Sequence, residues 1–565
     1  MISKRIKQLR SKFSKFGIDG YIVPKNDEFF SEYASKDRLK TISNFTGSAG
    51  FAIILRKKNY LFVDGRYSIQ AEKEAGKQFK ITRYEHIFNC RLFKNLTLGI
   101  DPKLFTSLQL QKYFEKYNKI KEIDLNLIDF IYNNYSFKSK SFYSLDKNIT
   151  GENYITKINK VSSYLKKNKK DFLFISSPEN VAWLLNIRGF DNPNSPIPNC
   201  RLIISNRNKL YLISEVIKLK KLIKEKKIKI NQVIEPKNLE NFLNNFKKKK
   251  ILIDQKSCSI YHENLFKKNF QISKSEDPTY FLKSIKNKKE IDNMINAHIL
   301  DGVALTKFLY WIKKINKKQI TEYDAQKKLE NFRKKNKNYL FPSFNTIAGA
   351  GSNGAIVHYR AKKKTAKIIK KKDIFLCDSG GQYRYGTTDV TRTICFSKQN
   401  EKIKNIFTKV LKGHIAVATV NLSKHFNGKS IDPLARKNLK LEGLDYEHGT
   451  GHGVGFFLNV HEGPQAISKN NDIKIRKGMI LSNEPGFYKK GKFGIRIENL
   501  VYVKKIKGKL MFENLTLAPI EKELINFKKL TDKEKNYLFN YHLDVYSKIS
   551  KFLNKQEKKW LASFI

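Results

Sequence analysis

The chain has 565 residues, too many for one hydrophobic core, and 40% of them are hydrophobic, so we expect two or three folded domains. The five cysteines are scattered and never spaced C-x-x-C, which argues against a disulfide framework or a thiolate zinc site and favours a reducing, cytoplasmic compartment. No apolar run reaches the ~18 residues of a membrane span, and the first residues lack a secretory signal, so we expect neither membrane insertion nor secretion.

The formal net charge of +59 raises the question of a nucleic-acid partner. Only 17 of the 111 basic residues are Arg, the side chain preferred for bidentate contacts to phosphate and guanine. The Lys residues are spread over the whole chain, and short runs such as 247–250 are not interleaved with aromatic residues that could stack on bases. We interpret the charge as a solvated Lys-rich surface and predict no specific nucleic-acid partner.

Two N-terminal segments share one order of elements. In the first, an amphipathic helix over 2–16 leads into the strand-like GYIV, and further strands follow a polar turn. In the second, the helix VSSYLKKNKK leads into DFLFISS, and the strands CRLIIS and KLYLIS follow. This order predicts one α/β unit used twice, over 1–147 and 148–286, in packed domains with short connections.

A third domain is predicted over 287–565. The segment NKKEIDNMINAHILDGVALTKFLYWIKK has apolar residues at three- and four-residue spacing, which predicts a long amphipathic helix. Helices then alternate with the β-branched runs DIFLCDSG, DVTRTICF, MILSNEP and IRIENLVYV, giving a mixed α+β domain. Its C-terminal extension, about 505–565, is predicted to contain a helix with an apolar face and a capping box formed by Thr531 and Glu534.

Two aspartates flank a predicted hairpin. In DIFLCDSGGQYRYGTTDVTRTICF, Asp378 closes the first strand and Asp389 opens the second, so strand pairing would set the carboxylates side by side. Adjacent carboxylates repel, and the pair needs a shared proton, a basic partner or bound cations. Two turn aspartates at strand ends are the alternative, and the pair alone does not decide between them.

Two glutamates belong to equally apolar segments. In GIRIENLVYV, the period of two places Arg496 and Glu498 on one face, and an inward Glu requires compensation. Glu484 raises the same issue after the apolar run of MILSNEPGF. Four carboxylates together with one imidazole are the hard ligands that a pair of Mn²⁺-like divalent ions prefers.

The stretch HGTGHGVGFFLNVHEGP, residues 448–464, contains three of the ten histidines among glycines that permit close approach of a ligand to the backbone. We expect one of His448, His452 and His461 to complete the metal site and the others to bind substrate. His358, which follows AGAGSNGA, is expected to join them. AGAGSNG fits G-x-G-x-x-G, but a strand-like run follows it, so we do not expect a dinucleotide site.

The long motifs resemble those of one family, the metal-dependent Xaa-Pro aminopeptidases (aminopeptidase P) of three-domain, cytosolic type, in the M24 metallopeptidase family. The motifs are VHY, DSGGQYRYGTTDVTRT, HGTGHGVGFFLNVHEGP, SNEPGFY and GIRIEN, and NFTGSAGFAI and VAWLLNIRG extend the resemblance over essentially the whole chain. It implies two creatinase- or ribonuclease-H-like α/β domains followed by a pita-bread catalytic domain. The C-terminal segment resembles one associated with homodimer formation.

The resemblance also implies a role for each candidate residue. The implied metal ligands, with Asp389 and Glu498 bridging two ions, are Asp378, Asp389, His452, Glu484 and Glu498. The histidines implied to bind substrate and stabilise the intermediate are His358, His448 and His461. Arg496 is implied to support the ligand carboxylates.

The implied activity is hydrolysis of the N-terminal Xaa-Pro bond in peptides with proline at the second position. A hydroxide bridging two divalent ions, Mn²⁺ before Zn²⁺ or Co²⁺, would attack the carbonyl before proline, and Glu484 would pass the proton to the proline nitrogen. The alternatives are an Xaa-Pro dipeptidase (prolidase) and a non-catalytic pita-bread module that binds peptides. Cleavage of tripeptides in preference to dipeptides, together with metal content, separates these three.

Overall fold

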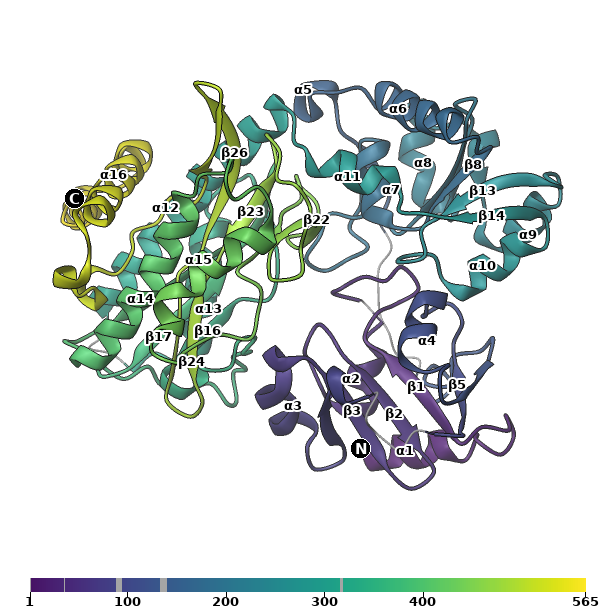
Figure 1. Ribbon diagram of the computed structural model, residues 1–565, viewed down its shortest axis with the longest axis horizontal. Coiled ribbons are helices and arrows are strands. Elements are labelled where there is room, and N and C mark those ends of the chain that lie inside the picture. Colours follow the sequence, from purple (N-terminus) through teal and green to yellow (C-terminus); the bar gives the residue numbers. More distant parts are fainter. Residues whose placement is uncertain (1, 35, 88–93, 133–139, 316–318) are drawn as a thin grey trace. The chain divides into compact units, whose positions relative to one another are not determined.

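The computed structural model describes residues 2–34, 36–87, 94–132, 140–315 and 319–565. The chain divides into two compact units, Met1–Lys283 and Ser284–Ile565 (Figure 1). Within the described ranges, no helix is both long and apolar enough to cross a membrane. Four of the cysteines are buried free thiols, namely Cys200, Cys258, Cys377 and Cys395; Cys90 lies outside the described residues.

The N-terminal unit contains two six-stranded sheets. The first has the order β4-β3-β2-β1-β5-β6 and the second β12-β11-β10-β8-β13-β14. The strands of the first sheet are β1 (Gly20–Pro24), β2 (Phe51–Leu55), β3 (Asn59–Val63), β4 (Lys80–Arg83), β5 (Thr97–Ile100) and β6 (Lys119–Glu122). Those of the second are β8 (Phe172–Ile175), β10 (Arg201–Ser205), β11 (Leu210–Ile213), β12 (Val233–Ile234), β13 (Lys249–Ile253) and β14 (Phe270–Lys274).

The two sheets repeat one topology. Each central strand, β1 or β8, pairs antiparallel with the next strand of its sheet in sequence and parallel with a later one. Each is preceded by a helix, α1 (Ile2–Arg10) or α6 (Tyr154–Lys167). The repeat predicted from the order of elements is therefore present in the fold.

The first helix is shorter than predicted. It ends at Arg10, and the chain continues through turns to Gly17, whose φ of 55° only glycine adopts readily. Phe13 still reaches the core, since it is fully buried and its carbonyl accepts the N–H of Ile18. The apolar spacing thus identified core residues correctly and placed the end of the helix wrongly.

The C-terminal unit begins with α12 (Lys288–Ile315), the long helix predicted from 287 onward, and α13 (Glu322–Lys334). Four sheets follow, with the orders β15-β18-β19, β16-β17-β20, β22-β21-β23-β26-β27 and β24-β25. The strands of the first two sheets are β15 (Tyr339–Pro342), β16 (Ile347–Ala350), β17 (Ile374–Ser379), β18 (Gly381–Tyr383), β19 (Gly386–Thr387) and β20 (Val390–Cys395). Those of the other two are β21 (Gly451–Gly453), β22 (Glu462–Ile467), β23 (Ile480–Asn483), β24 (Gly486–Lys489), β25 (Phe493–Arg496), β26 (Asn499–Ile506) and β27 (Lys509–Asn514). The helices α14 (Glu401–Ala418) and α15 (Gly428–Lys440) lie between β20 and β21 in sequence.

The run IRIENLVYV, predicted as one strand, is interrupted. The strand β25 ends at Arg496 and pairs with β24, whereas β26 begins at Asn499 and joins the five-stranded sheet. Between them, Ile497 N–H donates to Pro485 O (3.3 Å) and Glu498 N–H donates to Thr391 O (3.2 Å). The chain changes sheet here because these backbone bonds replace a continuous ladder.

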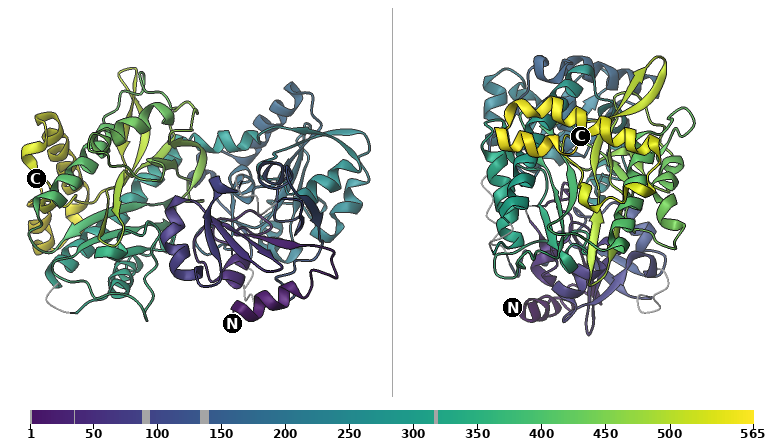
Figure 2. Two further views of the ribbon diagram at one scale, coloured as in Figure 1. Left: turned by 60° about the horizontal axis from the view of Figure 1, so that its bottom comes forward. Right: turned by 90° about the vertical axis from the view of Figure 1, so that its left-hand side faces the viewer.

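The C-terminal extension ends in α16 (Asp532–Ile549) and α17 (Lys555–Ala562), which pack against α12. Figure 2 shows this C-terminal pair in yellow. The predicted capping box is confirmed, because Glu534 N–H donates to Thr531 Oγ1 and the Glu534 carboxylate accepts the N–H of Thr531. The buried side of α16 includes Leu538 and Val545, whereas Phe539 and Leu543 are exposed.

Candidate active site

Two neighbouring strands bring the predicted aspartates together. The strands β17 and β20 pair antiparallel, with Asp378 opposite Thr391. Because alternate residues of a strand share a face, Asp389, directly before β20, lies on the same face as Thr391. The Asp378, Asp389 and Thr391 side chains therefore share one face, while Cys377 points the other way into an apolar cluster.

His452 on β21 faces two of the carboxylates. Its Nε2 lies 3.5 Å from Asp389 Oδ2 and 3.5 Å from Glu484 Oε1. Its Nδ1–H donates to Gly453 O at 2.9 Å, which fixes the orientation of the ring. Burial lowers the pKa of His452, but the hydrogen bond to Asp389 and the charges of Glu484 and Asp389 outweigh it and raise that pKa to about 9. This point in the site therefore stabilises positive charge.

The two glutamates are held by short contacts. Glu484, directly after β23, accepts a hydrogen bond from Ser482 Oγ at 3.0 Å and donates its backbone N–H to Thr450 O at 2.8 Å. Glu498 accepts the hydroxyl proton of Thr391 at 2.7 Å and is 2% exposed. Each carboxylate is thus fixed by a neighbouring hydroxyl group.

The acidic residues of the site repel one another, and their pKa values show this repulsion. Burial, followed by the charges of Asp389, Glu484 and Asp378, raises the pKa of Glu498 well above its ordinary value. Burial, with Asp389 and Glu484, also raises the pKa of Asp378 to about 7 even though Arg496 opposes the shift. So many buried carboxylates require compensating positive charge.

The donor set fits divalent cations. Single ligand atoms of Asp389, His452 and Glu498 lie within 4.8 Å of one another. The Asp378 Oδ1 atom is buried and has no hydrogen-bond partner among the residues that the structure describes, as expected of a ligand oxygen kept for a cation. Carboxylate oxygens and an imidazole nitrogen are the ligands that Mn²⁺ and related ions accept.

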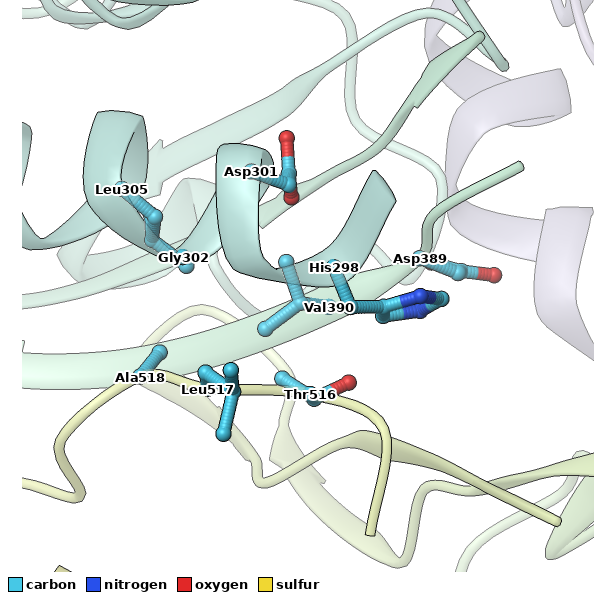
Figure 3. A pocket seen from close by; sticks show the side chains of 9 residues that line it. All are labelled: His298, Asp301, Gly302, Leu305, Asp389, Val390, Thr516, Leu517 and Ala518. Atoms are coloured by element: carbon cyan, nitrogen blue, oxygen red, sulfur yellow. The ribbon is translucent and has the colours of Figure 1, made fainter. Parts of the chain in front are cut away.

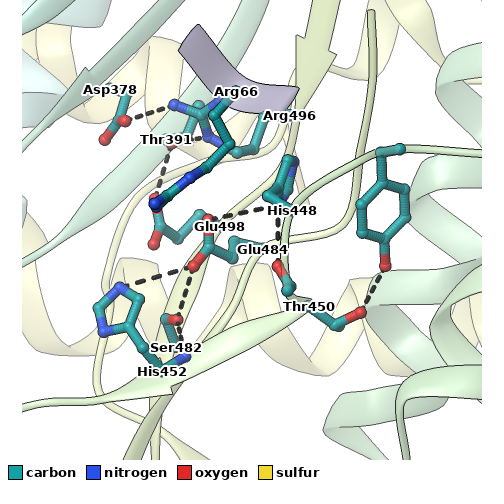
Figure 4. Close-up of polar contacts among 12 residues, drawn as sticks. Arg66, Asp378, Thr391, His448, Thr450, His452, Ser482, Glu484, Arg496 and Glu498 are labelled. Carbon is teal, nitrogen blue, oxygen red and sulfur yellow. Dashed lines mark hydrogen bonds and ion pairs between the residues drawn. The ribbon is translucent and has the colours of Figure 1, made fainter. Parts of the chain in front are cut away.

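A second row of polar groups borders the carboxylates (Figure 4). Arg496 forms an ion pair with Asp378, and its Nε donates to Thr391 Oγ1 at 3.0 Å. Its Nη1 donates to the hydroxyl of Tyr488 at 2.6 Å, and that hydroxyl lies 2.9 Å from His448 Nε2. The row thus connects His448 to Asp378 through two side chains.

Sequence reasoning missed Tyr488 and Thr391. Thr391 could have been found from the period of two, since it lies one alternate position beyond Asp389. Tyr488 required the pairing of β24 with β25, which sets Gly486 opposite Arg496 and therefore puts Tyr488 on the same face.

The other predicted histidines differ in how closely they approach the carboxylates. The His461 ring packs edge-on against the His452 ring, with centroids 4.3 Å apart. His448 Nδ1 lies 4.0 Å from Glu484 Oε2 and 2.8 Å from Gly449 O. His358 is half-buried in a turn after the short helix η6 (Gly351–Asn353). The substrate-binding roles of all three stay predictions.

Comparisons with known proteins cover the whole chain. The profile "Metallopeptidase family M24" matches residues 292–505, and "C-terminal region of peptidase M24" matches 508–563. The profile "Creatinase/Prolidase N-terminal domain" matches twice, at 5–129 and 135–290. A probable Xaa-Pro aminopeptidase P of Laccaria bicolor is 36% identical over 99% of this chain and 92% of its own length. Xaa-Pro aminopeptidase 1 of Dictyostelium discoideum is 36% identical over 100% of this chain and 96% of its own length.

The chain belongs to the Xaa-Pro aminopeptidase P family of M24 metallopeptidases. The fold class predicted from sequence, two creatinase-type domains before an M24 catalytic domain, is confirmed. The crystal structure of an X-prolyl aminopeptidase from Caenorhabditis elegans, described as a cytosolic enzyme with a di-nuclear active site, superimposes with a TM-score of 0.92 at 28% identity and covers 100% of this chain and 99% of that one. A prolidase from Pyrococcus furiosus has a TM-score of 0.52 at 25% identity and covers 63% of this chain and 98% of that one.

In this member of the Xaa-Pro aminopeptidase P family, residues of α12, of β20 and of the segment 516–518 lie beside Asp389 (Figure 3). A narrow space there leaves no room for a water molecule. Its lining residues are His298, Asp301, Gly302, Leu305, Asp389, Val390, Thr516, Leu517 and Ala518. Polar and apolar side chains both line this space, and Asp389 is only 4% exposed.

Proposed function

We propose that the chain is a metallo-aminopeptidase that hydrolyses the N-terminal Xaa-Pro bond of peptides and releases the N-terminal amino acid. The observation that carries this proposal is the convergence of buried carboxylates and one imidazole, in a chain similar over its full length to Xaa-Pro aminopeptidases. A non-catalytic peptide-binding module would have no reason to keep so costly a set of buried charges.

Two divalent ions would be held by Asp378, Asp389, His452, Glu484 and Glu498, with Asp389 and Glu498 shared between the ions. Oxygen-rich ligands favour Mn²⁺, and Zn²⁺ or Co²⁺ are the alternatives. Such a pair of ions lowers the pKa of a shared water and polarises the carbonyl that is attacked. Thr391 and Arg496 orient the carboxylates of Glu498 and Asp378 through the contacts described above.

The protein supplies the proton transfers. Glu484 accepts the proton of the attacking water and delivers it to the departing proline nitrogen, for which Ser482 and the Glu484 backbone bond to Thr450 hold it in place. His358, His448 and His461 bind the substrate around the scissile bond and stabilise the charge that develops on its carbonyl oxygen.

Proline determines the substrate class through its shape. An Xaa-Pro bond is a tertiary amide without an N–H group, so a peptidase that docks its substrate through that N–H does not accept it. A site fitted to the pyrrolidine ring gains selectivity because other residues lack the ring and carry the extra donor.

We also propose the wider arrangement of the protein. The domains are 1–147 and 148–286, of creatinase type, and 287–565, the catalytic domain with its extension from about 505. A homodimer in the cytoplasm is proposed, and the exposed Phe539 and Leu543 of α16 give an apolar surface for such a contact. No specific nucleic-acid partner is proposed.

The test compares three substrates with purified protein loaded with Mn²⁺. We expect an Xaa-Pro-Xaa tripeptide to release its N-terminal amino acid, an Xaa-Ala-Xaa tripeptide to stay intact, and an Xaa-Pro dipeptide to react more slowly than the tripeptide. Preference for the dipeptide would make the protein a prolidase. No cleavage with Mn²⁺, Zn²⁺ or Co²⁺ would contradict peptidase activity altogether.

A further inference from the structure

The segment that carries His448 is bound to helix α15 by one arginine. Arg436 Nη1 donates to Tyr446 O at 2.7 Å and its Nη2 donates to His448 O at 2.7 Å. Its Nε donates to Asp432 Oδ2 at 2.8 Å, one turn earlier on the same helix. A second Nη1 contact reaches Asp445 Oδ1 at 2.7 Å. Every bond of this guanidinium outside α15 therefore ends in residues 445–448.

The same ion pair also reaches Thr450, which Figure 4 labels beside Glu484. The hydroxyl of Thr450 donates to Asp432 Oδ1 at 2.6 Å and lies 2.5 Å from the hydroxyl of Tyr446. Thr450 is fully buried, and its carbonyl accepts the backbone N–H of Glu484 at 2.8 Å. Asp432 thus holds, through Thr450, the backbone from which the Glu484 side chain projects.

The ring of Tyr446 contacts both the guanidinium of Arg436 and the imidazole of His448. The Arg436 guanidinium lies 3.9 Å from the centroid of the Tyr446 ring. The centroids of the Tyr446 and His448 rings are 4.8 Å apart. Arg436 therefore holds the backbone carbonyl of His448, and Tyr446 contacts its ring. Its Nε2 is left to face Tyr488, next to Arg496 and the carboxylates.

The chemistry of these contacts calls for arginine. Two carbonyls and two carboxylates on different sides require several donors in a fixed plane, which a lysine ammonium cannot supply. The Asp432 and Arg436 side chains are 4% and 11% exposed, and a pair so buried contributes little net stability, since desolvation offsets its attraction. Its contacts instead define the position of one short segment.

We propose that Arg436, with Asp432, is a positioning residue that fixes His448 directly and Glu484 through Thr450. The inference rests on the proposed peptidase function, in which those two residues act on the substrate and the proton. Neither Arg436 nor Asp432 touches a metal ligand of the proposed set through its own side chain. The pair therefore acts on turnover through the two residues that it positions.

The first experiment uses Arg436→Gln, with Mn²⁺ content, kcat and KM measured on an Xaa-Pro-Xaa tripeptide. We expect kcat to fall about 10- to 100-fold, as for other residues that orient an active-site group, with two ions still bound and KM changed less than about threefold. Arg436→Lys, which keeps the charge and loses the fork, should recover only part of kcat. A kcat of Arg436→Gln equal to wild type would overturn the proposal.

A matched control separates positioning from stability. Leu439→Ala removes a fully buried side chain of the same helix and should lower the melting temperature at least as far as Arg436→Gln does. At a temperature where both variants are folded, Leu439→Ala should keep wild-type kcat. If both variants lost kcat equally, Arg436 would be a structural residue only.

A double-mutant cycle identifies the residue through which Arg436 acts. We expect His448→Asn to lower kcat by itself. When Arg436→Gln is added to His448→Asn, the further decrease in log kcat should be less than half of the decrease that Arg436→Gln causes in the wild type. Full additivity of the two effects would contradict the inference while leaving the wild-type peptidase assay intact. Absence of wild-type cleavage would instead contradict the proposed function.

Discussion

Buried charge is handled differently in the two units of the chain. In the N-terminal unit, Arg38 pairs with Glu28 at 2.8 Å and Asp129 at 2.7 Å, and both carboxylates are about a quarter exposed, at 28% and 27%. Although burial opposes it, Arg38 lowers the pKa of Glu28. In the C-terminal unit, Arg496 faces a larger set of acids, and the pKa values of Asp378 and Glu498 are raised.

The difference distinguishes a structural ion pair from a binding centre. The Arg38 cluster carries its own counter-charge and keeps part of its carboxylate surface in water. The cluster around Asp389 has more buried carboxylates than Arg496 can neutralise, and the raised pKa values of His452, Asp378 and Glu498 show that it favours added positive charge, from protons or from a bound cation. A cluster of buried acidic residues therefore indicates a cation-binding site when the basic residues around it do not balance its negative charge.

The largest expected effect comes from Asp389→Ala. We expect loss of bound metal and at least a ~1000-fold fall in kcat, since this carboxylate is proposed to be shared by both ions. Removing one of several repelling acids should leave the metal-free variant at least as stable as metal-free wild type. Metal analysis, peptide hydrolysis and melting in EDTA measure these three quantities.

The control for that experiment lies in the N-terminal unit. Asp129→Ala removes one partner of Arg38, so it should lower the melting temperature in EDTA and leave metal content unchanged. If metal-free Asp389→Ala were the less stable of the two variants, the contrast between the clusters would be wrong.

An intermediate effect is expected from the cation itself. Adding Mn²⁺ at 100 times its dissociation constant should stabilise the folded protein by about 2.7 kcal/mol for each ion bound, provided that the unfolded chain does not bind the ion. Scanning calorimetry with and without EDTA measures the shift. In Asp389→Ala the shift should vanish, whereas in Asp129→Ala it should persist.

The smallest effect concerns a buried base without acidic compensation. Burial, assisted by Arg392 and Lys522, lowers the pKa of His542 to about 4, and His542 Nε2 accepts the N–H of Ile520 at 3.1 Å. Because the folded pKa lies below the unfolded value, stability is complete above about pH 6.5 and falls as the pH decreases towards 4. At pH 5.5 the loss from this residue is about 1 kcal/mol.

Urea unfolding at pH 7.5 and 5.5 tests this pH dependence. His542→Gln, which keeps an acceptor for Ile520, should show a smaller difference between the two pH values than wild type. An equal difference in both proteins would assign the acid sensitivity to other groups, such as His414, whose pKa burial lowers to about 3.

Much of this arrangement was predictable from sequence because local patterns encode it. Strand ends and alternation identified Asp378 and Asp389, and the order of helices and strands revealed the repeated sheet. The prediction that Arg496 and Glu498 alternate along one strand was wrong, since β25 ends at Arg496 and β26 begins at Asn499. Both side chains reach the site because the chain crosses between two sheets there.

The supporting residues were not predictable, because they depend on pairings between distant segments. Tyr488 meets His448 only through the β24–β25 hairpin, and Arg436 meets His448 only because α15 packs beside the loop that precedes β21. No spacing within the sequence expresses either contact. The assignment of His358 rests on the family resemblance and stays a prediction.

The crossing at Glu498 has a mechanical consequence. Arg496 belongs to the small β24–β25 sheet and Asn499 to the five-stranded sheet, so Glu498 lies in the link between two sheets. Loosening of the smaller sheet would displace this carboxylate while most of the chain stayed folded. A bound cation would then dissociate before the protein unfolds globally. The rate of heat inactivation should therefore follow the local opening of the β24–β25 hairpin.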